Sequence, residues 1–222
     1  MFSGLIPVIV LTSLLRPTVA EGPPDTDGAS LAFARYVANV QHAASWSPET
    51  IQIDAFLPKL QKRGHLRAIR RLNSAGNADY QVLEIAGDRT VRQQVIERYL
   101  TAQMTAAELP AASIAMTPAN YRFRYQGAVR AGDTVAYVFQ IKPRKKRIGL
   151  IRGELWLDAE TGAAVRQSGR LVKSPSLFVK SIGIIRETVL SGGVAQKLLT
   201  HLSVDTRLVG LADLTVTESP LR

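Results

Sequence analysis

The residue types that most often carry enzyme or metal chemistry are few in this chain and lie far apart. Its three histidines, His42, His65 and His201, fall in separate predicted elements, and no pair has the spacing that places two metal ligands on one helix face. Cysteine is absent, which excludes a disulfide framework, a thiolate metal site and a cysteine nucleophile. The motifs of phosphate-binding loops and serine hydrolases are missing too. We therefore expect no enzymatic activity, no metal and no cofactor.

A second group of candidate residues is aromatic and lies on two successive predicted strands. Alternation along the strand that follows Asn120 places Tyr121, Phe123, Tyr125 and Val129 on one face, and Arg122, Arg124 and Arg130 on the other. Such a face is either ordinary core beneath a helix or the lining of a cavity that helices fill only in part. For the second case we expect the ligand-lining residues to be Tyr121, Phe123, Tyr125, Tyr137 and Phe139, with Val95, Tyr99 and Leu100 on a covering helix.

A third candidate is a concentration of positive charge. The formal net charge of the chain is +10, and a basic surface attracts phosphate groups. Arg122, Arg124, Arg166 and Arg170 would form a cationic outer face of the sheet. The segment Arg144–Arg147 is the densest run, and it is either a solvated turn or a contact for anionic lipid head groups. The residues expected at a membrane or anion contact are Lys142, Arg144, Lys145, Lys146 and Arg147.

The first twenty residues resemble a secretory signal peptide. Leu5–Leu15 is an apolar run, shorter than the roughly 20 residues that a membrane-spanning helix needs. Small or β-branched residues at 18–20 precede Glu21, as at a cleavage site, although no Lys or Arg precedes the apolar run. We expect residues 1–20 to be removed and the protein to be soluble and periplasmic or secreted; the alternative is an uncleaved N-terminal anchor. Export makes nucleic acid an unexpected partner.

The elements that must position these residues follow from periodicity. Residues 21–29 are expected to be a flexible leader, and residues 30–222 a single domain. Ser30 would cap a first helix and Asp88 a second, which runs from Thr90 to about Thr105. About three strands lie between the helices and about seven follow them. This order predicts an α+β fold, a strongly curved antiparallel sheet (an unclosed β-barrel) with two amphipathic helices covering its concave side.

One stretch resembles a known family. The segment Ala136–Pro143, the basic turn after it, then Gly153–Gly162 and Val165-Arg166 resemble the periplasmic outer-membrane lipoprotein-sorting proteins, the LolA/LolB-like superfamily, which includes the sensor domain of RseB-type regulators. The resemblance implies a half-barrel of roughly eleven strands whose hydrophobic cavity binds acyl chains. The unusually basic turn and the long strands after it depart from the family pattern.

Two functions remain open at this point. The first is a non-catalytic binder of acyl chains, either a carrier of a lipoprotein or lipid or a lipid-responsive sensor. The alternative is a structural or interaction module of the cell envelope that docks an anionic partner through its basic face. A continuous apolar pocket of about 300 Å³ or more would favour the first, and a solidly packed interior the second.

Overall fold

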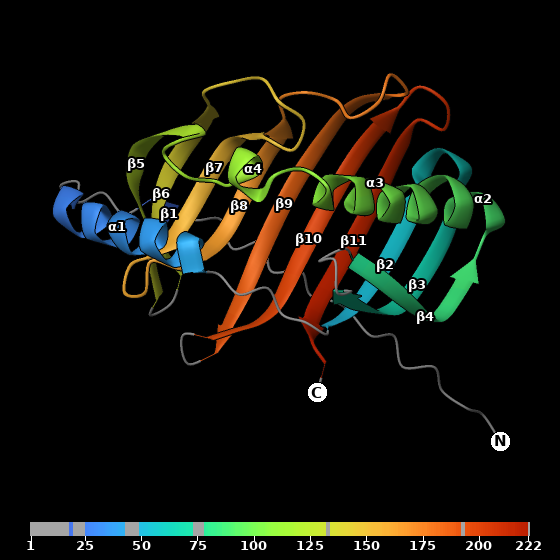
Figure 1. The fold of residues 1–222 in the computed structure, drawn as a ribbon, viewed down its shortest axis with the longest axis horizontal. Helices are drawn as coiled ribbons and strands as arrows, with labels where there is room; N and C mark the ends of the chain where they lie inside the picture. The colour runs from blue at the N-terminus through green and yellow to red at the C-terminus, as the bar shows by residue number, and fades with distance from the viewer. Residues whose placement is uncertain are drawn as a thin grey trace.

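The computed structural model describes residues 18–19, 25–42, 49–72, 78–131, 134–191 and 194–221, which form a single antiparallel sheet with helices on one face (Figure 1). The strands are β1 (Thr18–Val19), β2 (Glu49–Leu57), β3 (Lys62–Leu72), β4 (Ala78–Gly87), β5 (Tyr121–Ala131), β6 (Thr134–Pro143), β7 (Ile151–Asp158), β8 (Ala164–Leu171), β9 (Val179–Ser191), β10 (Val194–Thr206) and β11 (Leu211–Pro220). Their order is β1-β5-β6-β7-β8-β9-β10-β11-β2-β3-β4, so β1 and β4 form the two edges of an unclosed sheet.

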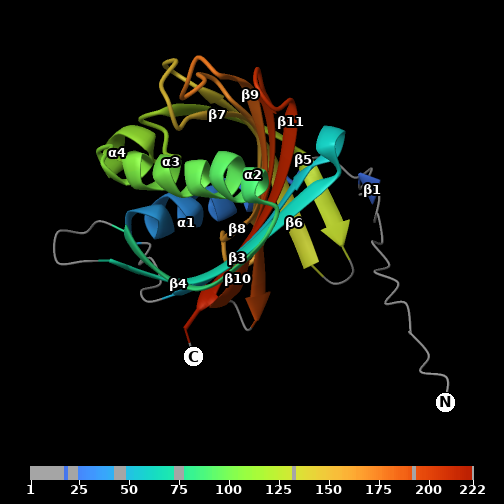
Figure 2. The same cartoon turned by 90° about the vertical axis from the view of Figure 1, so that its right-hand side faces the viewer.

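The helices lie on the concave side of this sheet, which curves around them (Figure 2). They are α1 (Thr26–His42), α2 (Arg89–Val91), α3 (Glu97–Ala107) and α4 (Ala111–Ile114), and a short 3-10 helix, η1, spans Pro58–Leu60. A π-helical stretch, Arg92–Ile96, joins α2 to α3, so helical backbone continues from residue 89 to 107. The predicted fold class, a curved unclosed antiparallel sheet with two principal helices against its concave side, is confirmed.

Local sequence signals predicted the start of one of the two principal helices correctly and that of the other incorrectly. Asp88 caps α2 as expected, since its Oδ1 accepts the N–H groups of Thr90 at 2.7 Å and Val91 at 3.4 Å. The expected cap at Ser30 is wrong. The first helix begins at Thr26, five residues before the expected start at Leu31, and Asp25 Oδ1 accepts the N–H of Gly28 at 2.8 Å. Residues 26–29, expected in the leader, are therefore helical.

The expected signal segment lies outside the described residues, apart from β1. Thr18 and Val19 pair there with Arg130 and Val129 of β5. Cleavage after Ala20 would remove this pairing and leave β5 as an edge strand.

A β-bulge in β5 makes part of the expected assignment of residues to the two faces of this strand wrong. Tyr125 and Gly127 pair with consecutive residues of β6, so Gln126 is an extra residue in β5. Gly127 has φ +144°, which a residue with a side chain rarely adopts. Beyond the bulge the alternation is inverted. Val129 therefore shares the convex face with Arg122, and Arg130 lies on the opposite face, the reverse of the expectation from simple alternation.

Two separate hydrophobic cores fill the concave side. The aromatic core lies between α1 and strands β5–β7, and its buried members are Ala29, Ala32, Tyr36, Tyr121, Tyr137, Phe139, Ile141, Leu150, Leu155 and Leu157. The aliphatic core lies beneath α2 and its continuation into α3, and its buried members are Ile51, Ile53, Ala55, Leu57, Leu66, Ala68, Val91, Val95, Ile96, Ala212, Leu214 and Val216. The second core depends on pairing between distant segments, since β11 lies beside β2.

Candidate functional site

The five aromatic residues predicted as ligand lining lie together in the aromatic core. Tyr125 pairs with Phe139 across β5 and β6, and Tyr137 lies two positions along on the same face. Helix α1 covers them with Phe33, whose ring centroid is 4.8 Å from that of Phe123 and 5.4 Å from that of Phe139. A ligand that entered between the helix and these rings would therefore have to displace α1.

Coverage by α1 is incomplete towards the β5 side of this row. Tyr121, Tyr137 and Phe139 are buried, whereas Phe123 and Tyr125 are only half-buried. The Tyr125 hydroxyl has no hydrogen-bond partner among the described residues although the oxygen itself is buried. An orphaned buried hydroxyl is costly, and it marks a place where the packing of this core is imperfect.

A few polar contacts hold α1 in place. At its start the Tyr137 hydroxyl donates to Asp25 Oδ2. Further along, the Tyr36 hydroxyl donates to the Met116 carbonyl at 2.9 Å, and the Arg35 guanidinium donates to the carbonyl of Glu160. The attachment of α1 to the sheet thus combines the apolar packing of Ala29, Ala32 and Phe33 with isolated hydrogen bonds.

The contact at the helix start shifts two pKa values in opposite directions. The hydrogen bond from Tyr137 lowers the pKa of Asp25 below its ordinary value of 3.8. The same bond raises the pKa of Tyr137 from 10.0 to about 12. Both shifts favour a neutral phenol that donates to an ionised carboxylate. Gly28 is required for this geometry, because a Cβ there would collide with the Tyr137 hydroxyl and the Asp25 carboxylate.

A hollow of about 450 Å³ lies at the foot of α1. Its lining is mixed: the charged residues Asp25, Arg130, Asp158 and Glu160 lie among apolar ones such as Val135, and the hollow meets the aromatic core at Tyr137. The volume lies within the usual range of ligand pockets, but the lining is not the continuous apolar surface that the carrier hypothesis calls for. Arg130 is in this hollow because the bulge in β5 turns it there.

The three residues expected on the lid are elsewhere. Val95 is buried in the aliphatic core, and Tyr99 and Leu100 pack against it. The expected arrangement therefore differs from the observed one: α1 covers the aromatic row, and the helix that carries Val95 covers the part of the sheet formed by β2, β3 and β11. Sequence periodicity identified both apolar faces but could not assign each to its partner.

A charged cluster that sequence reasoning missed lies beside the aliphatic core. Arg70 of β3 forms ion pairs with Glu49 and, at 3.5 Å, with Glu218. The Glu49 side chain is only 4% exposed, and burial raises its pKa although Arg70 opposes the shift. Burial also raises the pKa of Tyr99, which packs on the adjoining core. Glu49, Arg70 and Glu218 come from β2, β3 and β11, which meet only in the folded sheet. No local sequence signal could therefore have identified the cluster.

The predicted anion-contact residues are all exposed, and Arg144 is also anchored. Its Nε donates to the carbonyls of Pro118 at 2.8 Å and Tyr121 at 3.2 Å. On the convex face, Arg122 pairs with Lys142, and Lys142 is followed across the sheet by Arg152 of β7.

The remaining predicted outer-face arginines differ in their partners. Arg166 forms an ion pair with Glu187 and stacks over Trp156 at 5.4 Å from the ring centroid. Arg170 faces Arg152 directly. Arg166 is therefore neutralised locally, whereas Arg170 adds to the positive charge.

The histidines do not gather. His65 contacts Asp54 at 2.8 Å, and His201 contacts the Thr215 hydroxyl at 3.1 Å. Within the part of the chain that the structure describes, no group of three or more His, Asp or Glu side chains is arranged to hold a metal ion. The same residues include no helix with the length and apolarity needed to cross a bilayer.

No family model and no curated protein sequence matches the chain. Two solved structures are similar to it over most of its length. One is a LolA superfamily protein from Nitrosomonas europaea, with 9% identity, 87% of this chain and 93% of that chain covered, and a TM-score of 0.38. The other is MucB, with 13% identity, 90% and 95% covered, and a TM-score of 0.28. The first belongs to the superfamily that the sequence motifs resemble. Similarity at this level leaves the function to be argued from the chain's own residues.

Proposed function

We propose that this chain is a non-catalytic, exported binder of acyl chains, a carrier of lipid or lipoprotein or a lipid-responsive sensor. The observation that carries the proposal is the row of five aromatic side chains on the concave face, covered by one helix and left half-exposed at Phe123 and Tyr125. In this proposal α1 is the lid, and the helix with Val95, Tyr99 and Leu100 belongs to the scaffold.

Entry of a ligand exchanges one apolar contact for another. An acyl chain that lies along Phe123 and Phe139 would replace the contacts that Phe33 now makes with them, and each buried methylene contributes about 0.8 kcal/mol. A shift of α1 would break the hydrogen bonds of Asp25, Arg35 and Tyr36 and uncover the buried side chains of Ala29 and Ala32, so the bound acyl chain has to offset these losses. In the same proposal, Lys142 and the basic turn orient the protein on an anionic membrane.

The test is uptake of a fluorescent acyl probe by the 21–222 chain. Phe123→Asp should abolish uptake, because a carboxylate in the row cannot be desolvated. Ile185→Asp is the matched control, since Ile185 is an apolar residue with 38% exposure on the convex face of β9. Phe123→Leu, which keeps the site apolar, should retain folding and weaken uptake only modestly. Normal uptake by a folded Phe123→Asp variant would refute the proposal.

A second candidate function is favoured by the packing of the aromatic core. Tyr121, Tyr137 and Phe139 are buried, and Phe33 contacts their row directly, as in a filled structural module that docks an anionic partner through its basic face. Native mass spectrometry of the purified protein separates the two. Co-purifying lipid together with probe uptake supports the binder, and absence of both leaves the docking module.

A further inference from the structure

Three loops come together at one end of the sheet because antiparallel strands alternate in direction. The loops are 144–150 between β6 and β7, 172–178 between β8 and β9, and 207–210 between β10 and β11. Pairing of Tyr121 with Pro143, and of Ile151 with Leu171, places the first two at the same end, and pairing of Val179 with Thr206 adds the third. We call this the loop end, which is the upper edge of the sheet in Figure 1.

The loop end carries large apolar side chains that are mostly exposed to solvent. Leu177 is 89% exposed, Phe178 54% and Leu208 62%. The Arg207 N–H donates to the Phe178 carbonyl at 2.9 Å, so the two loops that bear these side chains are in contact. Clustered exposed apolar side chains on a protein surface usually mark an interaction site.

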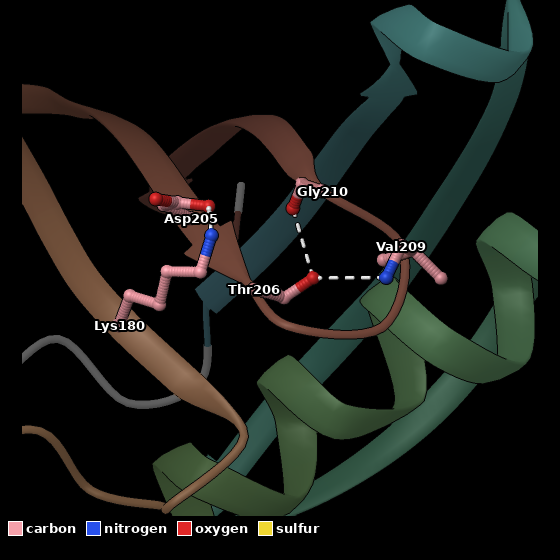
Figure 3. A network of polar contacts seen from close by, with 5 residues as sticks. All are labelled: Lys180, Asp205, Thr206, Val209 and Gly210. Atoms are coloured by element: carbon pink, nitrogen blue, oxygen red, sulfur yellow. Dashed lines mark hydrogen bonds and ion pairs between the residues drawn. The ribbon is translucent and has the colours of Figure 1, made fainter.

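The polar groups of these loops hold the apolar tips in fixed positions. In the β10–β11 loop the Thr206 hydroxyl donates to the Gly210 carbonyl at 2.8 Å and accepts the N–H of Val209 at 3.1 Å (Figure 3). Beside it, Lys180 forms an ion pair with Asp205 at 3.4 Å. Leu208 is therefore exposed on a loop whose conformation is fixed by its own hydrogen bonds.

The β8–β9 loop is held in a similar way. The Ser174 hydroxyl lies within hydrogen-bond distance of the carbonyls of Ser176 and Val179, at 2.9 Å and 2.6 Å. The Ser176 hydroxyl accepts the N–H of Phe178 at 3.2 Å. Leu177 and Phe178 thus project from a loop whose own backbone groups are bonded.

A row of cations lies directly below the loop end on the convex face. Each of the strands β5, β6, β7 and β8 contributes one residue next to its terminus at that end: Arg122, Lys142, Arg152 and Arg170. All four are exposed, and no ion pair of theirs occurs among the described residues. Like charges on neighbouring strands destabilise a sheet. The presence of four adjacent cations therefore indicates an external anionic partner that neutralises them.

The geometry points to the loop end as a membrane-docking surface. Leu177, Phe178 and Leu208 enter the interfacial region of a bilayer that contains anionic phospholipids, while the cation row and the basic turn contact lipid phosphates. This inference rests on the membrane-orienting part of the proposed function and assigns it an apolar anchor. A soluble polyanion would use the cations alone, whereas a lipid surface uses both kinds of group, as amphipathic membrane-binding elements do.

Co-sedimentation with phosphatidylcholine vesicles, with and without phosphatidylglycerol, tests the inference. The wild type should bind the anionic vesicles, and binding should weaken with salt because screening shortens the reach of the cations. Replacing Leu177, Phe178 and Leu208 by Ser should reduce binding about tenfold or more. Replacing Arg122, Lys142, Arg152 and Arg170 by Gln should reduce binding and weaken its salt dependence, and the part that remains is due to the basic turn.

A control variant at the opposite end of the sheet carries Val189→Ser and Lys197→Gln. Val189 is 51% exposed and Lys197 is also exposed, so this variant changes one apolar and one charged residue away from the loop end. Its vesicle binding should equal that of the wild type. Quenching by brominated lipid should be strong for Phe178→Trp and weak for Val189→Trp, each measured against the wild-type protein.

Each outcome separates this inference from the acyl-binding proposal. Acyl-probe uptake in the absence of vesicles should be unchanged in every loop-end variant. If the apolar variant binds vesicles like the wild type, insertion is refuted and only a charge contact stands. If the wild type fails to bind anionic vesicles at low salt, the docking surface is refuted, whatever the probe shows. Loss of probe uptake in Phe123→Asp with normal vesicle binding would leave both proposals standing.

Discussion

The aliphatic and aromatic cores share one sheet but differ in how they are sealed. In the aliphatic core, Ile51, Ile53 and Ile96 are fully buried, and the polar groups at its margin form the cluster around Arg70. In the aromatic core, Phe123 and Tyr125, two of the five rings in the row, are only partly buried. A tightly sealed core favours a single arrangement, whereas a loosely covered one allows its helix to move. The difference suggests a rigid scaffold at one end of the sheet and an adaptable site at the other.

The largest expected effect comes from the charged cluster at the rigid end. Arg70→Leu would leave Glu49 and Glu218 facing each other without a cation, which should lower the free energy of unfolding by about 3–5 kcal/mol. Arg67→Leu is the matched control, because Arg67 is an exposed residue of the same strand at 3.8 Å from Glu84 and should cost at most about 1 kcal/mol. Urea denaturation measures both, and equal losses would show that the cluster adds nothing special.

The two helix caps offer a direct comparison of the cores. Asp88→Ala removes the cap of α2 and should lower the urea midpoint of the whole domain, because that helix is part of the rigid scaffold. Asp25→Ala should instead speed amide hydrogen exchange within α1 and leave the global midpoint nearly unchanged. Hydrogen exchange by mass spectrometry reads both helices in one experiment. A global shift of equal size in the two variants would mean that the cores do not open separately.

The smallest effect is a pH dependence at the start of α1. The raised pKa of Tyr137 means that its contact stabilises the fold fully below pH 10 and loses this contribution as the pH rises towards about 12. The lowered pKa of Asp25 means that the contribution is present above its ordinary value of 3.8 and is lost as the pH falls through the depressed folded value.

Tyr137→Phe removes the dependence at high pH and the larger part of that at low pH, because the Gly28 N–H still lowers the pKa of Asp25. The stability difference between the wild type and this variant should therefore be flat at neutral pH and shrink at both extremes. Thermal denaturation across the pH range checks this, and a difference that does not change with pH would show that the hydroxyl bond to Asp25 does not form in solution.

Local patterns predicted much of this structure, and long-range pairing accounts for what they missed. Alternation along β5 and β6 correctly grouped Tyr121 with Phe139, because cross-strand neighbours share a face whenever the register is regular. It failed at Val129 because a bulge adds one residue, which alternation alone does not reveal. The cap at Asp25 was missed because Ser30 offered an equally good local signal. The cluster around Arg70 was beyond reach, since it needs β2, β3 and β11 in register.

The pairing of β11 with β2 also governs when this protein can fold. Thr217 near the end of the chain pairs with Gln52 near its beginning, so the ends of a long loop must meet before the sheet is continuous. Until β11 has emerged, β2 pairs only with β3, and β10 only with β9. Contacts of such high sequence separation form slowly. A chain that crosses a membrane in extended form would benefit from this delay, because its scaffold can close only after the last strand has arrived.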